Sequence, residues 1–319
     1  MNVKERTLEI LERLDGGCIS GEKLADMIGV SRNAVWKAVN KLREECHDIS
    51  VLKDGYALSK SDLPLTVGKL GKFLSDDKYK IQLYNTAVST NTMMKELAYR
   101  GEQEWSVILA EEQTGGRGRL GRSFLSPRFT GIYASVLLRP HMSMSRAVFI
   151  TVAAAVAAAR AIENVSGKRA EIKWVNDIYV GDRKVCGILT EASMNVENGI
   201  IDYAVLGIGI NAAEPEGGFG ELEGIAGALF ERASGLLRAE LIASFLNYFS
   251  EYYEKGFESS FEEYKRRQYL VGKEIEVISC DKTEPASAVG IDDECRLIVR
   301  MKSGELRALS SGDVSTKRL

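Results

Sequence analysis

The chain has 319 residues, of which 45% are hydrophobic and 27% charged, and its formal net charge is −3. This length predicts two or three domains, and the near-neutral charge excludes a nucleic-acid coat protein, so any DNA contact must come from a local patch. The five cysteines are scattered and never spaced Cys-x-x-Cys, which indicates reduced thiols rather than disulfides or a zinc site. With no signal-peptide pattern and no apolar run long enough to span a bilayer, we expect a soluble, cytoplasmic protein without membrane contact.

Residues 1–62 are expected to form a winged helix-turn-helix domain. Apolar spacing predicts helices over 3–14, 20–29 and 32–45, followed by a hairpin that turns at Asp54-Gly55. The third helix fits a DNA major groove, where Asn can read adenine and Lys can hold phosphates. The residues assigned to DNA are Ser31, Arg32, Asn33, Lys37, Asn40 and Lys41. The alternative is a protein-interaction winged helix whose polar face is merely solvated.

Residues 67–270, after a short linker, mix strands and helices. The predicted strands lie over 106–110, 131–138, 171–174, 185–192 and 201–210, and the predicted helices over 146–165, 238–255 and 257–267. Short turns at 181–182 and 197–199 join two strand pairs, so the sheet is at least partly antiparallel and the class is α+β rather than doubly wound. Residues 271–319 hold short strands over 274–280, 286–291, 296–301 and 306–309, which predict a small β-barrel.

The segment from Gly115 to Arg122 is a loop of four glycines and three arginines, suited to closing over a small anion. Its glycines also satisfy the dinucleotide fingerprint Gly-x-Gly-x-x-Gly. That fingerprint must open a helix and precede an acidic residue by about 20 positions, and this loop does neither. A flexible loop that binds nothing, or binds nucleic acid weakly, is the other interpretation on composition alone.

Four more polar segments accompany this loop: 89–91, 173–177, 181–189 and 207–211. Each has an ordinary structural interpretation by itself. Ser89 is typical of a helix N-cap, Asp177 of a turn, Lys184 of a solvated hairpin and Trp174 of a core residue.

Taken together, the Gly-Arg-Gly-Arg-x-Gly-Arg loop, Lys-Trp-x-Asn-Asp, Asp-Arg-Lys-x-x-Gly-Ile-Leu and Gly-x-Gly-Ile-Asn resemble the bifunctional biotin protein ligase and biotin operon repressor family over essentially the full chain. The resemblance implies a winged helix, a class II synthetase-like ligase core at 67–270 and an SH3-like barrel at 271–319. The chain departs from the family at Val175, where proline is usual, and at Phe124, near which a well-known bacterial member has tryptophan.

The resemblance also implies the activity and the roles of the residues. Biotin and ATP, with Mg²⁺, would give biotinyl-5′-adenylate and pyrophosphate, and the biotinyl group would pass to a lysine of a biotin carboxyl carrier protein. Biotin would be bound by Ser89, Thr90, Asn91, Gln113, Arg117, Gly118, Arg119 and Lys184. The nucleotide would be bound by Arg119, Arg122, Phe124, Asn176 and Asn211, and the catalytic set would be Arg117, Arg119, Lys184 and Asp177.

The charge requirement of adenylation agrees with these roles, because a carboxylate attacks a phosphate and two anions must be brought together. No dedicated carboxylate cluster marks a metal ligand. Binding of the adenylate is expected to order the Gly-Arg loop and favour a homodimer on two-fold operator DNA. Three alternatives stay open: a lipoate or octanoyl ligase or transferase, a non-catalytic ligand-responsive transcription factor, and a ligase whose winged helix no longer binds DNA.

Overall fold

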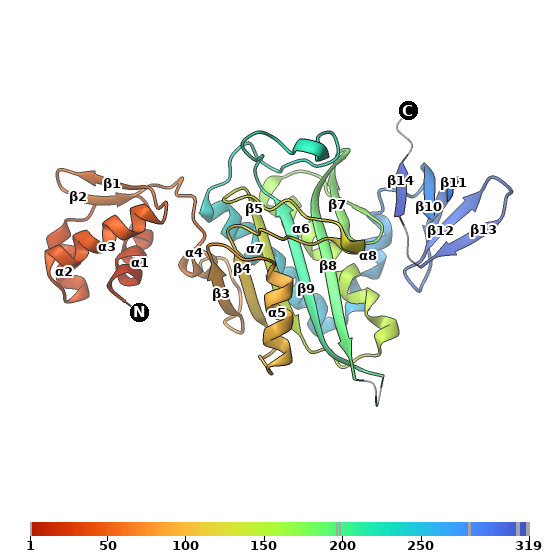
Figure 1. Ribbon diagram of the computed structural model, residues 1–319, viewed down its shortest axis with the longest axis horizontal. Helices are drawn as coiled ribbons and strands as arrows, with labels where there is room; N and C mark the ends of the chain where they lie inside the picture. Colours follow the sequence, from red (N-terminus) through yellow and green to blue (C-terminus); the bar gives the residue numbers. More distant parts are fainter. Residues whose placement is uncertain (1, 196, 198, 280–281, 311–312, 317–319) are drawn as a thin grey trace.

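The computed structural model describes residues 2–195, 197, 199–279, 282–310 and 313–316. Three units follow one another along the long axis: an N-terminal helical unit, a central sheet covered by helices, and a C-terminal sheet (Figure 1). The predicted class, α+β with a winged helix at the N-terminus and short antiparallel strands at the C-terminus, is confirmed.

The N-terminal unit consists of three helices and a two-stranded hairpin, as predicted. They are α1 (Val3–Arg13), α2 (Gly21–Ile28), α3 (Arg32–Glu44), β1 (Ile49–Leu52) and β2 (Gly55–Leu58). Ser20 and Ser31 begin α2 and α3 by accepting hydrogen bonds from the backbone N–H of Lys23 and Ala34. Gly29 ends α2 at a φ of 78°, which glycine adopts without strain. The apolar faces of the helices pack into a core of their own, leaving one face of α3 exposed.

Asp62 fixes the end of this unit to the segment that follows. Its carboxylate accepts hydrogen bonds from His47 Nδ1 at 2.9 Å, Lys69 Nζ at 2.6 Å and the backbone N–H of Asp48 at 2.8 Å. Burial alone would raise the pKa of Asp62, but the bonds from His47 and Lys69 outweigh it and lower that pKa. Lys69 belongs to the short helix α4 (Val67–Gly71), so the linker is held at both of its ends.

A second buried ion pair holds the linker against the central unit. Arg238 Nη1 lies 2.8 Å from Glu111 Oε2, and the two residues are 0% and 2% exposed. Arg238 also donates to the backbone carbonyls of Leu63 and Gly131, while the backbone N–H of Leu65 donates to Glu111. The linker is therefore part of the packed structure rather than a free tether.

The seven described strands of the central sheet pair in the order β3 (Lys80–Tyr84), β4 (Ser106–Ala110), β5 (Gly131–Leu138), β9 (Ile201–Asn211), β8 (Arg183–Met194), β7 (Asp177–Val180) and β6 (Glu171–Lys173). β3 and β4 are parallel, and every later pair along this order is antiparallel. The expectation of a partly antiparallel sheet is therefore confirmed.

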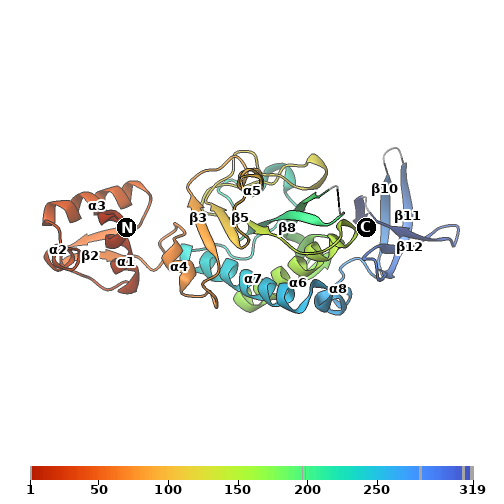
Figure 2. The same ribbon diagram turned by 90° about the horizontal axis from the view of Figure 1, so that it is seen from below.

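Helices cover both faces of the sheet (Figure 2). α6 (Val148–Ser166) and α7 (Gly235–Lys255) pack on one face, and α5 (Thr90–Tyr99) packs on the other. Seven of the residues of α6 are buried alanines, which let α7 approach closely. By length and composition the segment Met144–Ser166 could cross a membrane, but it is largely buried, as the core helix of a soluble protein is.

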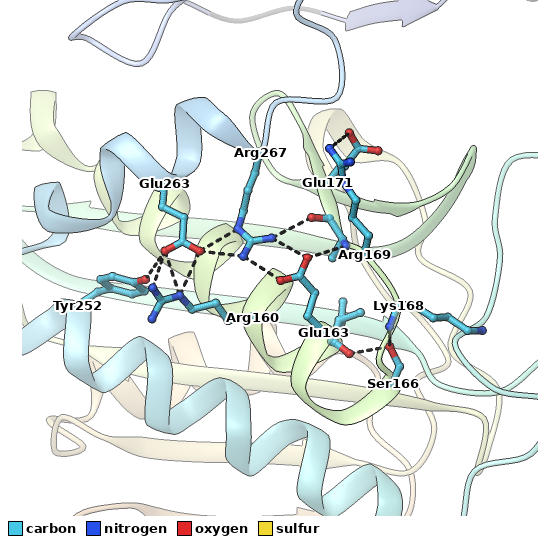
Figure 3. Close-up of polar contacts among 11 residues, drawn as sticks. Arg160, Glu163, Ser166, Lys168, Arg169, Glu171, Tyr252, Glu263 and Arg267 are labelled. Atoms are coloured by element: carbon cyan, nitrogen blue, oxygen red, sulfur yellow. Dashed lines mark hydrogen bonds and ion pairs between the residues drawn. The ribbon is translucent and has the colours of Figure 1, made fainter.

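A network of charges ties α6 to α8 (Phe261–Arg266), the helix that leads to the C-terminal unit (Figure 3). Glu263 lies 2.6 Å from Arg160 Nη2 and 2.8 Å from Arg267 Nη2, and Arg267 Nη1 lies 2.9 Å from Glu163. Burial alone would raise the pKa of Glu263, but the hydrogen bonds from Arg160 and Arg267 outweigh it and lower that pKa. The network therefore holds its carboxylates ionised.

The five described strands of the C-terminal unit form an antiparallel sheet in the order β13 (Leu306–Leu309), β12 (Leu297–Met301), β11 (Lys282–Ile291), β10 (Glu274–Ser279) and β14 (Asp313–Thr316). Two hydrogen bonds reach from this end of the molecule to the segment 173–177. Trp174 Nε1 donates to the carbonyl of Cys295 at 2.8 Å, and the hydroxyl of Tyr264 donates to the carbonyl of Val175 at 3.1 Å. Trp174 is thus the buried core residue that its type predicts.

The structure changes several of the predicted bounds. β8 begins at Arg183 rather than 185, and the helix predicted over 257–267 is the 3-10 turn η4 (Phe257–Ser260) followed by α8. The strands β3, β7 and β14 were not predicted, because each has four or five residues and a segment this short gives a weak local signal. Cys280, at the end of the strand predicted over 274–280, and residue 198, in the turn predicted at 197–199, lie outside the described residues.

Candidate active site

A cavity of about 500 Å³ lies over β5, β8 and β9, beside the N-terminal end of α5. It is lined by segments that are far apart in the sequence, from Ser89 to Ile278, and that the fold brings together. Every residue that the sequence assigned to biotin, to the nucleotide or to catalysis lines this cavity. The predicted polar segments therefore form one site.

The segment 89–91 forms the buried polar end of the cavity. Ser89 occupies the N-cap position of α5, as its type predicts, but among the described residues its side chain gives no capping hydrogen bond. Gln113 Oε1 instead accepts from the backbone N–H of Thr90 at 2.9 Å. Ser135 Oγ lies 2.8 Å from Thr90 Oγ1 and 2.6 Å from Asn91 Oδ1. The buried end thus offers oriented donors and acceptors rather than charge.

The Gly-Arg loop lines one side of the cavity. Its backbone reverses at Leu120 and Gly121, with φ values of 57° and 74°, and the N–H of Gly118 donates to the carbonyl of Arg122 at 2.7 Å. Arg119 Nη1 donates to Asn176 Oδ1 at 3.1 Å, while Arg117 is exposed. The loop continues into a single 3-10 turn, η1 (Arg119–Gly121), so the dinucleotide fingerprint is not in its required context.

Phe124 lies flat against glycines of the sheet. A Cβ at Gly209 would come within 2.5 Å of the Phe124 ring, and a Cβ at Gly187 within 3.4 Å. Glycine at 209 is therefore needed for the ring to approach the strand. The ring has an edge-to-face contact with Tyr133, which fixes its plane.

Asp177 and Lys184 form an ion pair inside the cavity, with 2.7 Å between Oδ1 and Nζ. Antiparallel pairing of β7 with β8 brings the two side chains together across the turn at Gly181. The Lys184 side chain is 29% exposed, so the interpretation of a freely solvated hairpin lysine is wrong. The side chain of Asn176 is also held in place, because its Nδ2 donates to the carbonyl of Ile188 at 2.7 Å.

This arrangement combines three chemical elements in one cavity: a buried uncharged polar end, a cluster of cations and an aromatic ring beside the sheet. Such a cavity suits a ligand that is polar but uncharged at one end and anionic in the middle. Within the described residues, no group of three His, Cys, Asp or Glu side chains could hold a metal ion.

Comparison with known proteins agrees with this arrangement. The profile of the biotin/lipoate A/B protein ligase family matches residues 83–211, a helix-turn-helix domain matches 4–57, and the biotin protein ligase C-terminal domain matches 270–317. The chain is 31% identical to the bifunctional ligase/repressor BirA of Bacillus subtilis over an alignment that covers 98% of each protein. The chain belongs to the BirA family. It is 32% identical to BirA of Bacillus spizizenii, again over 98% of each protein.

A solved structure shares the fold of this BirA family member. The biotin protein ligase from Aquifex aeolicus, in complex with biotin and ATP, superposes with a TM-score of 0.61 at 23% identity, covering 75% of this chain and 99% of that one. The family resemblance and the fold implied by the sequence motifs are thus confirmed.

The predicted DNA-binding residues lie together on the N-terminal unit. Arg32, Asn33, Lys37 and Lys41 are exposed on α3, Asn40 is half-buried, and the Ser31 hydroxyl caps the helix. Sequence reasoning missed Trp36, whose side chain is 54% exposed on the same helix. The sequence does indicate this exposure, because Trp36 lies outside the apolar face that the helical spacing predicts.

Sequence reasoning also missed several apolar residues that line the cavity. Leu222 and Ile225 come from the loop after β9, and Ile278 comes from β10 of the C-terminal unit. Asn211 Nδ2 anchors that loop by donating to the carbonyl of Gly227 at 3.1 Å. Single apolar residues in a loop or a short strand carry no local sign that they line a site.

Proposed function

We propose that this protein is an ATP-dependent biotin protein ligase and a biotin-responsive, DNA-binding transcriptional repressor. The observation that carries the ligase proposal is the joining of a buried, uncharged polar end and a cation cluster in one cavity. A cyclic urea suits the first, and an acyl-phosphate suits the second. Biotin and ATP are the substrates, and biotinyl-5′-AMP and pyrophosphate are formed before the biotinyl group passes to a lysine of a carboxyl carrier protein.

In the adenylation step the biotin carboxylate attacks the α-phosphate, and pyrophosphate leaves. Arg117, Arg119 and Lys184 are placed to offset the negative charge that accumulates there. Arg119 is held by Asn176 and Lys184 by Asp177, so neither cation must reorganise as charge develops. Removing such a donor lowers the rate by roughly a hundredfold or more.

The nucleotide is assigned to the side of the cavity near Phe124, whose ring offers a stacking surface for adenine. Arg122, Asn176 and Asn211 line the same side. The described residues do not fit a dedicated Mg²⁺ site, because Asp177 is the acidic side chain that lines the described cavity and Lys184 already pairs with it. Mg²⁺ is expected to enter with the phosphates of ATP.

In the transfer step the ε-amine of the carrier lysine attacks the acyl carbon, AMP leaves, and the amine loses a proton. Asp177 is assigned to orienting the incoming amine, since its carboxylate already holds an ammonium group at 2.7 Å in this structure. Its partner Lys184 is thereby placed beside the acyl-phosphate oxygens.

One incubation tests the ligase proposal. Purified protein with biotin, ATP, Mg²⁺ and a biotin-carrier domain should increase the mass of the carrier by one biotinyl group. If lipoate is transferred and biotin is not, the proposal is wrong. Arg119→Ala should release adenylate into solution faster than wild type, whereas Arg169→Ala, an exposed arginine outside the cavity, should not.

The repressor proposal rests on the exposed basic and amide side chains of α3. Replacing Lys37 and Lys41 with Ala should weaken binding to operator DNA, lower the salt dependence of binding by roughly two phosphate contacts, and leave ligation unchanged. Lys80→Ala, in the central unit, is the matched control. Loss of ligation in the α3 variant would mean that the units are coupled differently.

The proposal also covers the domain bounds, the oligomeric state and the location of the protein in the cell. The DNA-binding domain spans residues 1–62, the ligase domain 67–270 and the C-terminal domain 271–319. The adenylate-bound protein forms a homodimer, because ordering of the Gly-Arg loop around an anion favours one conformation of the surface that this loop forms. Sedimentation with and without biotin and ATP checks this, and an unchanged molecular mass would contradict it. The protein is assigned to the cytoplasm, where its carrier and DNA are found.

A further inference from the structure

We infer that Glu191 is a positioning residue for biotin: it turns the side-chain amide of Asn91 so that the amide offers the ligand an oxygen acceptor. An acceptor at this point selects a ligand that carries an N–H group, as the ureido ring of biotin does. This inference rests on the proposed ligase function and adds a determinant of substrate choice to it.

Glu191 lies on β8, next to the buried end of the cavity, and contacts α5 through two side chains. Its Oε2 accepts a hydrogen bond from Asn91 Nδ2 at 2.9 Å, and its Oε1 lies 2.7 Å from Lys95 Nζ. Asn91 is 5% exposed and lines the cavity, whereas the Glu191 side chain is 31% exposed. Glu191 therefore acts through Asn91.

The chemistry of its partners fixes which way the Asn91 amide faces. Nδ2 has two N–H groups, and they point to Glu191 and to the carbonyl of Leu189 at 3.3 Å, both of which can only accept. Oδ1 accepts from Ser135 Oγ at 2.6 Å and has a second acceptor position. What Asn91 can offer a ligand is therefore an acceptor.

The space around this oxygen is matched to its orientation. A Cβ at Gly207 would come within 2.2 Å of Asn91 Oδ1, so glycine is needed there for the amide to lie against β9. Gly207 and Asn91 both line the cavity. Asn91 Oδ1 is thus held between Gly207 of β9 and the groups that hydrogen-bond to the Asn91 amide.

A neighbouring amide offers the complementary group. Gln113 Oε1 accepts from the backbone N–H and the hydroxyl of Thr90, and its Nε2 donates one N–H to Ser126 Oγ at 3.0 Å. Its second N–H is a donor. An acceptor from Asn91 and a donor from Gln113 match the N–H and C=O groups of a cyclic urea.

The negative charge of Glu191 stabilises the orientation of the Asn91 amide in which Nδ2 faces Glu191. Burial alone would raise the pKa of Glu191, but hydrogen bonds from Lys95 and Asn91 and the nearby charge of Arg117 outweigh it and lower that pKa. A carboxylate that is ionised at neutral pH cannot donate, so a reversed amide would place Oδ1 against a negative charge.

The direct test is Glu191→Gln, which keeps the shape of the side chain and removes the charge. Lys95 can only donate, so it should hold the new carbonyl and turn the new NH₂ group toward Asn91. The Asn91 amide would then lose its stronger reason to keep this orientation, which only the carbonyl of Leu189 would still favour. We expect KM for biotin to rise roughly 10- to 100-fold, KM for ATP and kcat at saturating biotin to change little, and desthiobiotin, which keeps the ureido ring, to lose as much.

A second variant restores the pair with its polarity exchanged. In Asn91→Asp/Glu191→Gln, the new carboxylate accepts from the new amide and still presents an oxygen to the ligand. Its KM for biotin should return to within about fivefold of wild type, while Asn91→Asp alone, which sets two carboxylates together, should be strongly impaired. The double variant also keeps the test available if either single variant fails to fold.

Glu102→Gln is the matched control, because Glu102 forms a similar ion pair with Lys80 at 2.8 Å away from the cavity, and its kinetics should equal those of wild type. The inference is overturned if Glu191→Gln raises KM for ATP as much as KM for biotin, if it lowers only kcat, or if the double variant is no better than the worse single one. Wild-type protein that transfers lipoate instead of biotin would refute the ligase proposal itself, which is a different outcome.

Discussion

Breaking the buried ion pair between Glu111 and Arg238 should destabilise the central unit strongly. In Arg238→Met the Glu111 carboxylate keeps the hydrogen bond from the backbone of Leu65 but loses its cation, in a site where it is 2% exposed. The carbonyls of Leu63 and Gly131 lose their donor as well. An uncompensated buried charge of this kind costs about 3–5 kcal/mol of unfolding free energy.

Urea unfolding followed by tryptophan fluorescence measures this loss, since Trp105 and Trp174 lie in the central unit. With a slope of about 1–3 kcal/mol per M of urea, a loss of about 3–5 kcal/mol should lower the midpoint by roughly 1–5 M. Arg238→Met/Glu111→Gln removes the uncompensated charge and should recover most of the loss. A single variant that loses less than about 1 kcal/mol, or a double variant no more stable than the single, would refute the reasoning.

Two further predictions follow from the pKa shifts. The pKa of Glu263 lies below its usual value of 4.5, so its ion pairs contribute stability that is complete above about pH 4.5 and is lost as the pH falls through the lowered pKa. In thermal melts from pH 7 to 3, the melting temperature of Glu263→Gln should therefore fall less steeply with pH than that of wild type. An equally steep fall would contradict this. Burial raises the pKa of the Cys186 thiol and raises that of Cys295 to about 12. Iodoacetamide at pH 8 should therefore label the exposed Cys18 and Cys46 in the native protein and spare the buried pair, which mass spectrometry of peptides checks, and rapid labelling of Cys186 would show that the core opens.

Local signals predicted the helices and most of the strands. The serines that begin α2 and α3, the glycine that ends α2 and the turn before β2 act within a few residues of their own position, so the sequence reveals them directly. β7 was missed because four residues are too few for an alternating pattern to stand out, although Ile178, Tyr179 and Val180 each favour a strand. The side chain of Ser89 gives no capping hydrogen bond, and Gln113, from another segment, accepts from the first N–H group of the helix, that of Thr90.

The sequence by itself determined the order of the three units, the glycine- and arginine-rich loop and the polar segments that line the cavity. Only the tertiary structure decided how those residues are paired. The pairing of β7 with β8 allows the ion pair between Lys184 and Asp177, and the packing of α5 on the sheet allows the hydrogen bond between Asn91 and Glu191. The C-terminal unit contributes Ile278 to the lining of the cavity. The physical reason is distance along the chain. Periodicity and capping are local, whereas the partner of a buried polar group is selected by the packing of distant segments, as for Glu111 and Arg238, which are 127 residues apart.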